Sequence, residues 1–575
     1  MAHETALFAG ILLALVAGLI SGAAKPAILF LLASTVTYLV GMVDLNGFLH
    51  GLTNSGLITL VLLLLCSVAL EKTSLIGQIS KIIGRGSFYG TMAKLGFSTA
   101  FLSSFTNNTA VVASLIGAVR RNQQHDPAKL LLPLSYAAIL GGTLTLIGTS
   151  THLIVNSFVE NAGLKPLGFF EFSAIGLVIV VVGVSLLILL AGLLPVRVDS
   201  NQDLSLPYLL EARVAANSVL IGNSVQDNHL RALKHLYLVE LERHGIRICP
   251  VPPQLILNEN DILRFSGAVE AVELLHQFHG LEWFGKQQAK GQNLIEAVLA
   301  PSSALIGKSL KSAQFRDQYN AAVMAIRRGH HPLKGGLGDI NLQAGDVLLL
   351  APGQNFSKQP KLKRDFAAVS GLDVSARLDK KRNLLVLGSF ATVMLTSLCF
   401  DIPLIKGLAV LLMGYLALGA LTLSEIKRRF PYELVIIVSS ALSLANLMLT
   451  SGLAKLLADG FMGLFNGFGV MGAFIAVYLF TLILTELITN NAAAALAFPI
   501  AYAIALSFGV DSRPFILAVV FGASASFISP YGYQTNLMVM SAGNYRFVDF
   551  LRLGLPLSLV YSVIVIMLVP LLFPF

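Results

Sequence analysis

The pentapeptide Thr106-Asn107-Asn108-Thr109-Ala110 has a near copy, Thr489-Asn490-Asn491-Ala492-Ala493, close to the other end of the chain. Each copy lies in the middle of an apolar segment, at about residues 95–119 and 479–505. Two adjacent asparagines are unfavourable in contact with lipid, and they are tolerated where the backbone is interrupted and lines a cavity. We therefore predict that each segment is a re-entrant helical hairpin that turns at its Asn-Asn pair.

A second pair of related stretches follows downstream of the two pentapeptides. Residues 148–155 (Gly-Thr-Ser-Thr-His-Leu-Ile-Val) resemble residues 532–539 (Gly-Tyr-Gln-Thr-Asn-Leu-Met-Val). These stretches are 384 residues apart (532 minus 148), and the pentapeptides are 383 residues apart (489 minus 106). Two motifs with almost the same offset indicate that the chain contains two related halves, at residues 1–196 and 379–575.

The composition predicts that both halves lie in a lipid bilayer. Hydrophobic residues make up 55% of the chain and charged residues only 12%, whereas soluble proteins carry about 25% charged residues. Apolar runs of roughly 20 residues, enough to cross a membrane as a helix, recur in both halves. Such runs exclude an outer-membrane barrel, whose strands alternate polar and apolar residues. We interpret the net charge of +9 as cytoplasmic loop bias and expect no nucleic-acid partner.

The placement of lysine and arginine predicts how the chain crosses the membrane. Sixteen of these residues fall in one set of loops, whereas the alternate loops hold only Lys165, Lys406, Lys455 and Arg513. The positive-inside rule places the richer set in the cytoplasm, together with the charged middle region. Both termini are then predicted on the outer side of the inner (plasma) membrane. Each half needs five crossings and one hairpin that enters and leaves on the same side.

The two hairpins are predicted to enter the membrane from opposite sides. The first has basic residues at both ends and would enter from the cytoplasm, whereas the second has poorly charged flanks and would enter from outside. An odd number of crossings per half makes the halves inverted copies, which is the architecture of many secondary transporters. The predicted fold of these halves is therefore an all-α polytopic membrane protein built from inverted repeats.

A hairpin that turns at Asn-Asn offers both kinds of helix end in one place. The helix that ends there leaves free carbonyl groups, which suit a hard cation such as sodium. The helix that begins there leaves free amide groups at the positive end of its dipole, which suit an anion. No lysine or arginine lies in the predicted membrane core. A bound anion would then be held by amides, hydroxyls, helix ends and co-bound cations, so we expect sodium coupling.

Two titratable residues lie near these motifs, and the sequence leaves their roles open. Glu486, in the second hairpin, could orient the hairpin tip, relay a proton or only support packing. The first hairpin has Ser103 at the corresponding place in the alignment. His152 corresponds to Asn536 of the other half, and it could be a proton-sensitive ligand or a hydrogen-bonded packing residue.

The middle region contains a second internal repeat, with a period of 85 residues. Arg243 recurs as Arg328 (328 minus 243), and the turn Asn260-Asp261 recurs as Gly345-Asp346. Short alternating stretches such as residues 236–240 and 322–327 are typical of strands. We predict two small cytosolic α+β domains, at residues 197–286 and 287–378. A G-x-G-x-x-G motif after a strand and a P-loop are both missing, which argues against a complete dinucleotide-binding or ATPase domain.

Residues 1–196 and 379–575 resemble the divalent anion:sodium symporter (DASS) family of the ion transporter superfamily. The resemblance rests on the two hairpin tips and on segments 147–151 and 534–537. The usual tip of that family is Ser-Asn-Thr. The Asn-rich tips here are similar to its sulfate-permease-like branch, also called sulfur-deprivation-response transporters, which moves the expected substrate from dicarboxylate to sulfate. The middle domains look like the paired TrkA-C (RCK-C) domains of that branch.

The resemblance implies binding residues around both tips. The anion is expected at Thr106, Asn107, Asn108, Thr109, Thr489, Asn490, Asn491, Thr151, Thr535 and Asn536. Sodium ions are expected near Ser104, Asn107, Gly148, Thr149, Thr485, Asn490, Ser529 and Gly532. The resemblance also implies a homodimer, an elevator-type motion of a transport region that contains both hairpins, and an unidentified nucleotide-type regulatory ligand on the TrkA-C-like domains.

Other functions stay open beside sodium-coupled sulfate symport. The same mechanism could carry a C4-dicarboxylate or citrate. A gated ion channel or cation/proton antiporter regulated by the middle domains would need a selectivity-filter loop or paired membrane acids, and the chain has no T-V-G-Y-G-like segment and one central acid, Glu486. The conspicuous polar residues are Asn and Thr at lipid depth rather than a catalytic set, so we predict that the chain is not an enzyme.

Overall fold

The computed structural model of this chain contains two compact units. It describes residues 2–73, 87–120, 124–194, 208–230, 236–244, 246–267, 281–287, 295–300, 303–328, 331–333, 337–352, 356, 359, 361–369, 379–400, 402–464 and 469–575. The helical unit comprises Met1–Pro195, Arg377–Asn536 and Phe547–Phe575. The second unit comprises Val196–Ala376 and Leu537–Arg546.

Helices make up the two membrane halves. The first half contains α1 (Ala2–Ser21), α2 (Pro26–Leu39), α3 (Leu45–His50), η1 (Gly51–Thr53), α4 (Ser55–Glu71), α6 (Phe88–Ser103), α7 (Asn108–Arg120), α8 (Pro127–Gly142), α9 (Ser150–Asn161), α10 (Ser173–Leu190) and η2 (Ala191–Leu193). The second half contains α14 (Lys380–Phe400), α15 (Leu404–Ala417), α16 (Leu423–Arg429), α17 (Tyr432–Thr450), α18 (Leu453–Leu464), α19 (Gly469–Leu487), α20 (Asn490–Phe508), α21 (Arg513–Ser524), α22 (Gln534–Ala542) and α23 (Phe547–Leu572).

Many of these helices are long and apolar enough to cross a bilayer, which needs roughly 20 residues. Among the described helices, seven meet that length and composition: His3–Ser21, Leu45–Glu71, Ser173–Leu193, Tyr432–Thr450, Gly469–Leu487, Asn490–Phe508 and Phe547–Leu572. Four shorter apolar helices accompany them: Pro26–Leu39, Asn108–Arg120, Leu404–Ala417 and Arg513–Ser524. A mostly helical, polytopic membrane protein, as predicted from the composition, agrees with this architecture.

Polar residues mark where several helices of the first half begin. The Asn54 side chain accepts a hydrogen bond from the Leu57 amide at the start of α4 (3.0 Å). Asp126 does the same for the Ala128 amide at the start of α8 (2.8 Å). Each cap satisfies an amide that the first turn of a helix leaves without an internal partner. Local sequence therefore fixes these starts inside otherwise apolar stretches.

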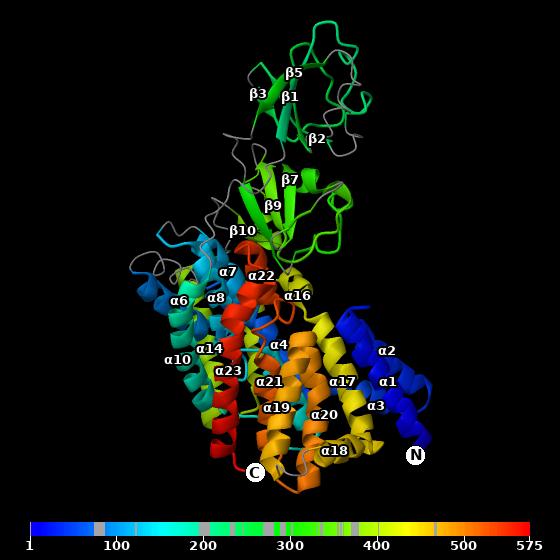
Figure 1. The fold of residues 1–575 in the computed structure, drawn as a ribbon, viewed down its shortest axis with the longest axis vertical. Coiled ribbons are helices and arrows are strands. Elements are labelled where there is room, and N and C mark those ends of the chain that lie inside the picture. The colour runs from blue at the N-terminus through cyan, green and yellow to red at the C-terminus, as the bar shows by residue number, and fades with distance from the viewer. Residues whose placement is uncertain are drawn as a thin grey trace. The chain divides into compact units, whose positions relative to one another are not determined.

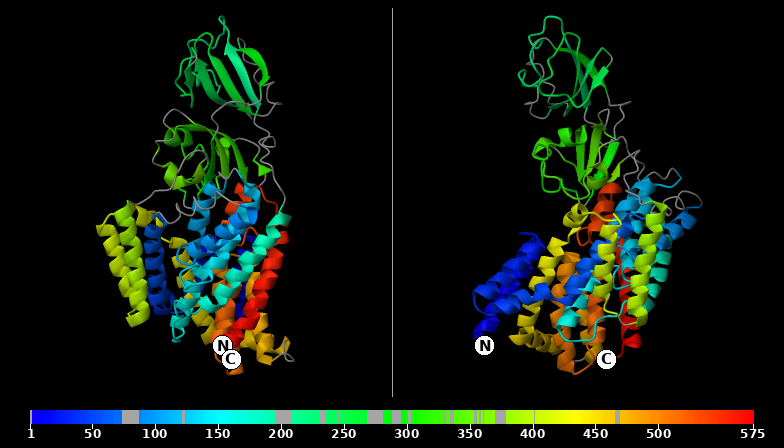
Figure 2. Two further views of the ribbon diagram at one scale, coloured as in Figure 1. Left: turned by 90° about the vertical axis from the view of Figure 1, so that its left-hand side faces the viewer. Right: turned by 180° about the vertical axis from the view of Figure 1, so that it is seen from behind.

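Each half contains a helical hairpin, α6–α7 in the first and α19–α20 in the second. In Figure 1 the open end of α19–α20 lies at the end of the helical unit that holds both chain termini, and the open end of α6–α7 lies at the other end. Figure 2 shows both termini at that same end from two further directions. The hairpins extend beyond the predicted segments, because α6 begins at Phe88 and α19 at Gly469.

Close backbone contacts hold each hairpin against the next helix. A Cβ on Gly141 of α8 would lie 2.2 Å from the Ala100 carbonyl oxygen of α6. A Cβ on Gly522 of α21 would lie 3.0 Å from Cβ of Thr481 on α19. Glycine at these two positions lets the backbones approach, which is how membrane helices gain packing energy without a hydrophobic driving force. The two helices that carry these glycines end in backbone breaks, at residues 143–149 and 525–533.

The second unit contains two five-stranded antiparallel sheets. The first has the order β3-β2-β4-β1-β5, from strands β1 (Tyr208–Val214), β2 (Leu236–Arg243), β3 (Ile246–Ile248), β4 (Ile262–Gly267) and β5 (Leu281–Gln287). The second has the order β10-β6-β9-β7-β8, from strands β6 (Ile295–Leu299), β7 (Ala321–Arg328), β8 (His331–Pro332), β9 (Val347–Pro352) and β10 (Phe366–Val369). Short helices α12 (Phe315–Tyr319), η4 (Leu337–Asp339) and α13 (Leu362–Asp365) accompany the second sheet. Matched strand by strand, the two sheets have the same order.

A buried ion pair recurs at the same place in both sheets. Arg243 donates from Nε and Nη2 to the two carboxylate oxygens of Asp261 (2.8 and 2.7 Å). Arg328 does the same to Asp346 (2.8 and 2.9 Å). The hydrogen bond to the buried carboxylate raises the pKa of each guanidinium above its ordinary value. The 85-residue repeat therefore reproduces the side-chain pairing as well as the strand order.

Candidate transport site

The tip of the first hairpin is organised by its own polar side chains. The Ser103 hydroxyl, at the end of α6, bonds to the Asn108 side chain at the start of α7. The Thr106 hydroxyl donates to the Leu102 carbonyl (2.7 Å). Asn107 Oδ1 accepts from the Thr109 amide (2.8 Å), which caps α7. Asn108 is thus turned inward and nearly fully buried, whereas Asn107 serves its own helix.

The tip of the second hairpin uses the same hydroxyl-to-asparagine bond. Thr485 Oγ1 donates to Asn490 Oδ1 (2.8 Å) and lies 2.9 Å from the Ala523 carbonyl oxygen in the last turn of α21. Asn490 is buried and begins α20, whereas Thr489 before it is exposed. The Thr485 hydroxyl therefore links α19, α20 and the end of α21.

The two tips match in a register that differs by one residue from the sequence alignment. The hydroxyl lies five residues before the asparagine in both hairpins, at Ser103 and Asn108 and at Thr485 and Asn490. This pairs Asn108 with Asn490 at an offset of 382 (490 minus 108). A sequence alignment instead pairs Asn107 with Asn490. It matches three identical residues, Thr-Asn-Asn, whereas the structural register matches a serine hydroxyl with a threonine hydroxyl. The counterpart of Glu486 is therefore Ser104 rather than Ser103.

The first break packs directly on the Asn108 amide. A Cβ on Gly142 would lie 2.8 Å from Asn108 Nδ2, and a Cβ on Gly148 would lie 2.4 Å from the Gly142 carbonyl oxygen. With its amide oriented to satisfy these neighbours, Asn108 donates to the carbonyls of Ala138 (3.2 Å) and Gly148 (3.1 Å). The two glycines therefore make room for the asparagine at the first break.

The second break is arranged around Gly532 and Asn536. A Cβ on Gly532 would lie 2.8 Å from the Thr485 carbonyl oxygen, so the break and the second hairpin are in backbone contact. Asn536 Nδ2 donates to the carbonyls of Ser526 (3.0 Å) and Ser529 (3.3 Å). Carbonyl and hydroxyl oxygens therefore gather here, and such hard, neutral ligands suit a sodium ion.

One polar side chain links each break to the hairpin beside it. In the second half this side chain is an acid, Glu486. The Glu486 carboxylate accepts hydrogen bonds from the backbone amides of Phe527 (2.9 Å), Ile528 (2.9 Å) and Ser529 (2.7 Å). All three bonds are donated to the acid, the pattern that an ionised carboxylate satisfies. Of the roles left open for Glu486, this contact supports orientation of the break.

In the first half a neutral threonine takes the place of this acid. The Thr145 hydroxyl donates to the Ser104 carbonyl at the end of the first hairpin helix. The same oxygen accepts from the amides of Ile147 and Gly148, both at 3.3 Å. The first break is thus tied to its hairpin by a hydroxyl that donates to a backbone carbonyl, and the second by a carboxylate that accepts backbone amides.

The hairpin tip of each half also bonds to the break of the other half. Asn108 lies 3.0 Å from the Tyr533 hydroxyl, which comes from the second break. The Ser150 hydroxyl, at the start of α9 directly after the first break, donates to Asn491 Oδ1 at the second tip (2.8 Å). Segments 425 and 341 residues apart in the chain therefore meet through neutral amides and hydroxyls.

Further hydroxyls continue this contact on either side. Thr151 lies 2.9 Å from the Ser524 hydroxyl, across the two breaks. Ser135 of α8 donates to Thr535 (2.9 Å) and to Asn536 Oδ1 (2.7 Å). All five side chains are buried. None of the side chains in these cross-half contacts is lysine or arginine.

Most predicted site residues are brought together, and a few are not. Sodium-site candidates Thr485, Asn490, Ser529 and Gly532 lie around the second break, and Ser104, Gly148 and Thr149 lie around the first. Thr489 is instead exposed, and the Asn107 side chain caps its own helix, α7. The His152 ring stacks on Phe172 with centroids 4.5 Å apart, and its Nδ1 lies 3.0 Å from the Thr145 carbonyl oxygen, which supports packing.

Sequence reasoning missed four contributors: Ser103, Ser135, Thr145 and Tyr533. A hydroxyl five residues before each asparagine was a usable signal for Ser103. Tyr533 stands inside the quoted repeat at the position of Thr149, where its larger side chain broke the symmetry visibly. Ser135 gave no signal, because a serine inside an apolar helix is as readily a packing residue.

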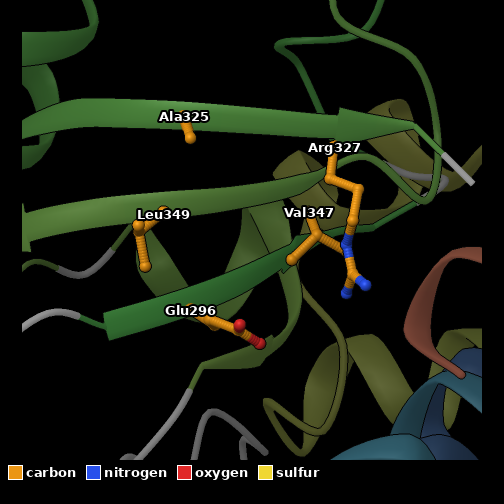
Figure 3. A pocket seen from close by; sticks show the side chains of 5 residues that line it. All are labelled: Glu296, Ala325, Arg327, Val347 and Leu349. Atoms are coloured by element: carbon orange, nitrogen blue, oxygen red, sulfur yellow. The ribbon is translucent and has the colours of Figure 1, made fainter. Parts of the chain in front are cut away.

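A pocket in the second unit lies away from the core of its sheet. Figure 3 shows the five side chains that line it: Glu296, Ala325, Arg327, Val347 and Leu349. Residues alternate along these strands, with Ile326 and Leu348 in the core, so the pocket is on the opposite face. One acidic and one basic side chain among aliphatic ones give no concentrated positive charge for a phosphate. The pocket therefore assigns no nucleotide-type ligand.

Comparison with known proteins identifies the family of this chain. A putative sulfur deprivation response regulator of Chlamydomonas reinhardtii is 32% identical over 561 residues, which cover 93% of this chain and 96% of the relative. Sodium/sulfate cotransporter 1 of the same alga is 28% identical over 370 residues, covering 61% of this chain and 41% of that protein. The crystal structure of the Alcanivorax borkumensis YdaH transporter covers 99% of this chain and 98% of its own at 12% identity, with a TM-score of 0.44, too distant to compare residues. The family model for citrate transporters, CitMHS, matches residues 11–522. The chain therefore belongs to the CitMHS citrate transporter family and is a multi-pass membrane transporter.

Proposed function

We propose that this chain is a sodium-coupled symporter of a small divalent anion, with sulfate as the substrate. The observation that carries the proposal is the pair of cross-half bonds, Asn108 to Tyr533 and Ser150 to Asn491. They bring two hairpin tips and two helix breaks to one place inside the helical unit. All four side chains in these two bonds are neutral, so an anion would be held there by amides, hydroxyls and helix ends.

The helix ends at this place supply the charge complementarity. Helices α7, α9 and α20 begin at Asn108, Ser150 and Asn490. Their N-terminal amides carry the positive ends of the helix dipoles, which favour an anion. Carbonyls of the breaks, such as those of Ser526 and Ser529, would receive the sodium ions. A co-bound cation then offsets the substrate charge that no basic side chain neutralises.

Two candidate substrates follow from the relatives. One relative is named a sodium/sulfate cotransporter and another a sulfur deprivation response regulator, which favours sulfate. The family model is described as a citrate transporter, which favours citrate or a C4-dicarboxylate as the second candidate. Both use the same site and the same coupling, so they differ only in the anion that fits between the tips.

The wider arrangement belongs to the same proposal. We infer two inverted repeats, at residues 1–196 and 379–575, each with five crossings and one hairpin. The hairpins enter the membrane from opposite sides, and both termini lie on the outer side of the inner membrane. Residues 197–286 and 287–378 are two cytosolic TrkA-C-like domains that regulate transport through a nucleotide-type ligand. Two copies form a homodimer whose transport regions move by an elevator-type mechanism.

Uptake by the purified full-length protein in proteoliposomes tests the proposal. Labelled sulfate should accumulate with an inward sodium gradient and not with an equal potassium gradient. Succinate and citrate are added as competitors in the same assay. Sulfate uptake that ignores sodium would defeat the coupling, and competition by citrate but not by unlabelled sulfate would replace the substrate by the second candidate.

A pair of variants adds a control within the chain. N490A removes the amide that holds Thr485 at the second tip, and it should abolish uptake while the protein still elutes as a folded species in size-exclusion chromatography. N446A alters an asparagine of α17 whose side chain is exposed, and it should transport like the unmodified protein. Equal uptake by both variants would remove the tip from the mechanism.

A further inference from the structure

Tyr533 joins three elements of the proposed site through one hydroxyl. It is the last residue of the second break, directly before α22. Its hydroxyl lies 3.0 Å from the Asn108 amide at the first hairpin tip and also hydrogen-bonds to the Thr149 side chain of the first break. A single aromatic side chain of one half therefore bridges the tip and the break of the other half.

Within the repeat at residues 148–155 and 532–539, this is also a position where the two side chains differ strongly in size. The repeat that begins at Gly148 and Gly532 aligns Tyr533 with Thr149. A threonine at that place could not span the distance that the phenol ring spans. The other partners at the meeting point, Asn108, Asn491 and Ser150, have short side chains. Among the side chains in these cross-half contacts, Tyr533 is therefore the largest, and its ring lies next to the first tip.

We propose that Tyr533 is the specificity-determining residue of the transporter, and this inference rests on the proposed function. Its ring limits the space beside Asn108 to a compact tetrahedral oxyanion and excludes the longer dicarboxylates and citrate. Its hydroxyl supplies a hydrogen bond to that anion. Sulfate is fully ionised at neutral pH and needs only donors, and a phenol beside amides and hydroxyls provides them.

The Tyr533 hydroxyl also has a hydrogen-bond partner when no substrate is bound. Asn108 is buried and Tyr533 is half-buried, and each satisfies the polar group of the other. When the anion enters, both groups turn from each other to the substrate oxygens. The exchange replaces one neutral hydrogen bond by bonds to a charged group, which are the stronger kind.

Two substitutions separate the ring from the hydroxyl. Y533F keeps the ring, so it should raise the KM for sulfate about tenfold, the factor for one hydrogen bond to a charged group, and succinate should still not compete. Y533T introduces the residue of the other half, so succinate and citrate should become competitors and the preference for sulfate should fall at least tenfold. Y533L tests the size argument with an apolar side chain if Y533T does not fold.

The matched control is Y531F, because Tyr531 lies two residues earlier in the same break and is exposed. It should keep both the KM and the selectivity of the unmodified protein. The inference is overturned if Y533F has an unchanged KM, or if Y533T and Y533L transport sulfate with unchanged selectivity. Absence of sulfate uptake by the unmodified protein would instead refute the proposed function, whatever the variants do.

Discussion

Replacing Glu486 by glutamine tests whether the second break must be held by a charged brace. The carboxylate accepts three backbone amides, from Phe527, Ile528 and Ser529, between 2.7 and 2.9 Å. Glutamine has almost the same shape. Its oxygen can still accept from Phe527 and Ile528, but its NH₂ group would face the Ser529 amide, so two donors would meet.

The magnitude follows from the bonds that change. A hydrogen bond to a charged group contributes about 1.5–3 kcal/mol, and an unsatisfied buried donor costs about 1–3 kcal/mol. E486Q loses the Ser529 bond and weakens the other two, so we expect a loss of about 2–3 kcal/mol in the stability of the positioned break. At 1.4 kcal/mol per factor of ten, this is a roughly 30- to 150-fold fall in sulfate uptake at low substrate concentration.

The assay is the initial rate of sulfate uptake in proteoliposomes over a range of sodium concentrations. E433Q is the control, since Glu433 is exposed at the start of α17, and it should stay within twofold of the unmodified protein. E486D keeps the charge but not the reach, so it should also lose most uptake. Uptake by E486Q within twofold at every sodium concentration would refute the brace.

Three further substitutions address other contacts. G142A places a Cβ 2.8 Å from the Asn108 side-chain amide and should lower the rate of sulfate uptake at least tenfold. G414A, whose Cβ would have open space around it, should leave the rate unchanged. Equal uptake rates in the two variants would contradict the close contact between Gly142 and Asn108. N108A should impair uptake more than N107A, because only Asn108 contacts the other half, and the reverse order in the same assay would restore the sequence register. D346N removes one partner of a buried ion pair and should destabilise the second unit by about 3 kcal/mol, seen as faster limited proteolysis of the middle region in the full-length protein; unchanged proteolysis would count against it.

The sequence predicted those features of the fold that depend on composition and on internal repetition. Apolar runs identified the polytopic character. The 85-residue period identified two related domains, in which Arg243 and Arg328 make the same hydrogen bonds to their aspartate partners. The residues at which the hairpin helices begin were harder to predict from the sequence. Lys94 and the polar residues before it obscure the first turns of α6, and the apolar residues from Gly469 onward could equally begin an ordinary span.

The candidate site could be located from the sequence, but its internal pairing could not. Asn-Asn in an apolar segment signals a break wherever it occurs. Which asparagine turns inward depends on a hydroxyl five residues earlier, at Ser103 or Thr485 in the preceding helix. In the first half it also depends on a glycine in another helix. Contacts such as Asn108 to Tyr533 join residues 425 positions apart. One sequence carries no record of such pairs, because each partner is also an ordinary packing residue.

The absence of basic side chains from these contacts has a physical reason in a transport cycle. A lysine or arginine would bind a divalent anion well, but it would remain as an uncompensated charge in the membrane once the anion left. Neutral groups avoid that, because Asn108 with Tyr533, and Ser150 with Asn491, satisfy one another when the substrate is gone. Sodium ions can supply the missing positive charge and leave together with the anion. The Glu486 carboxylate is likewise compensated within the protein, by three backbone amide donors. In the symport mechanism that we propose, such a site would couple anion movement to cation movement, because neither charge would be stable there alone.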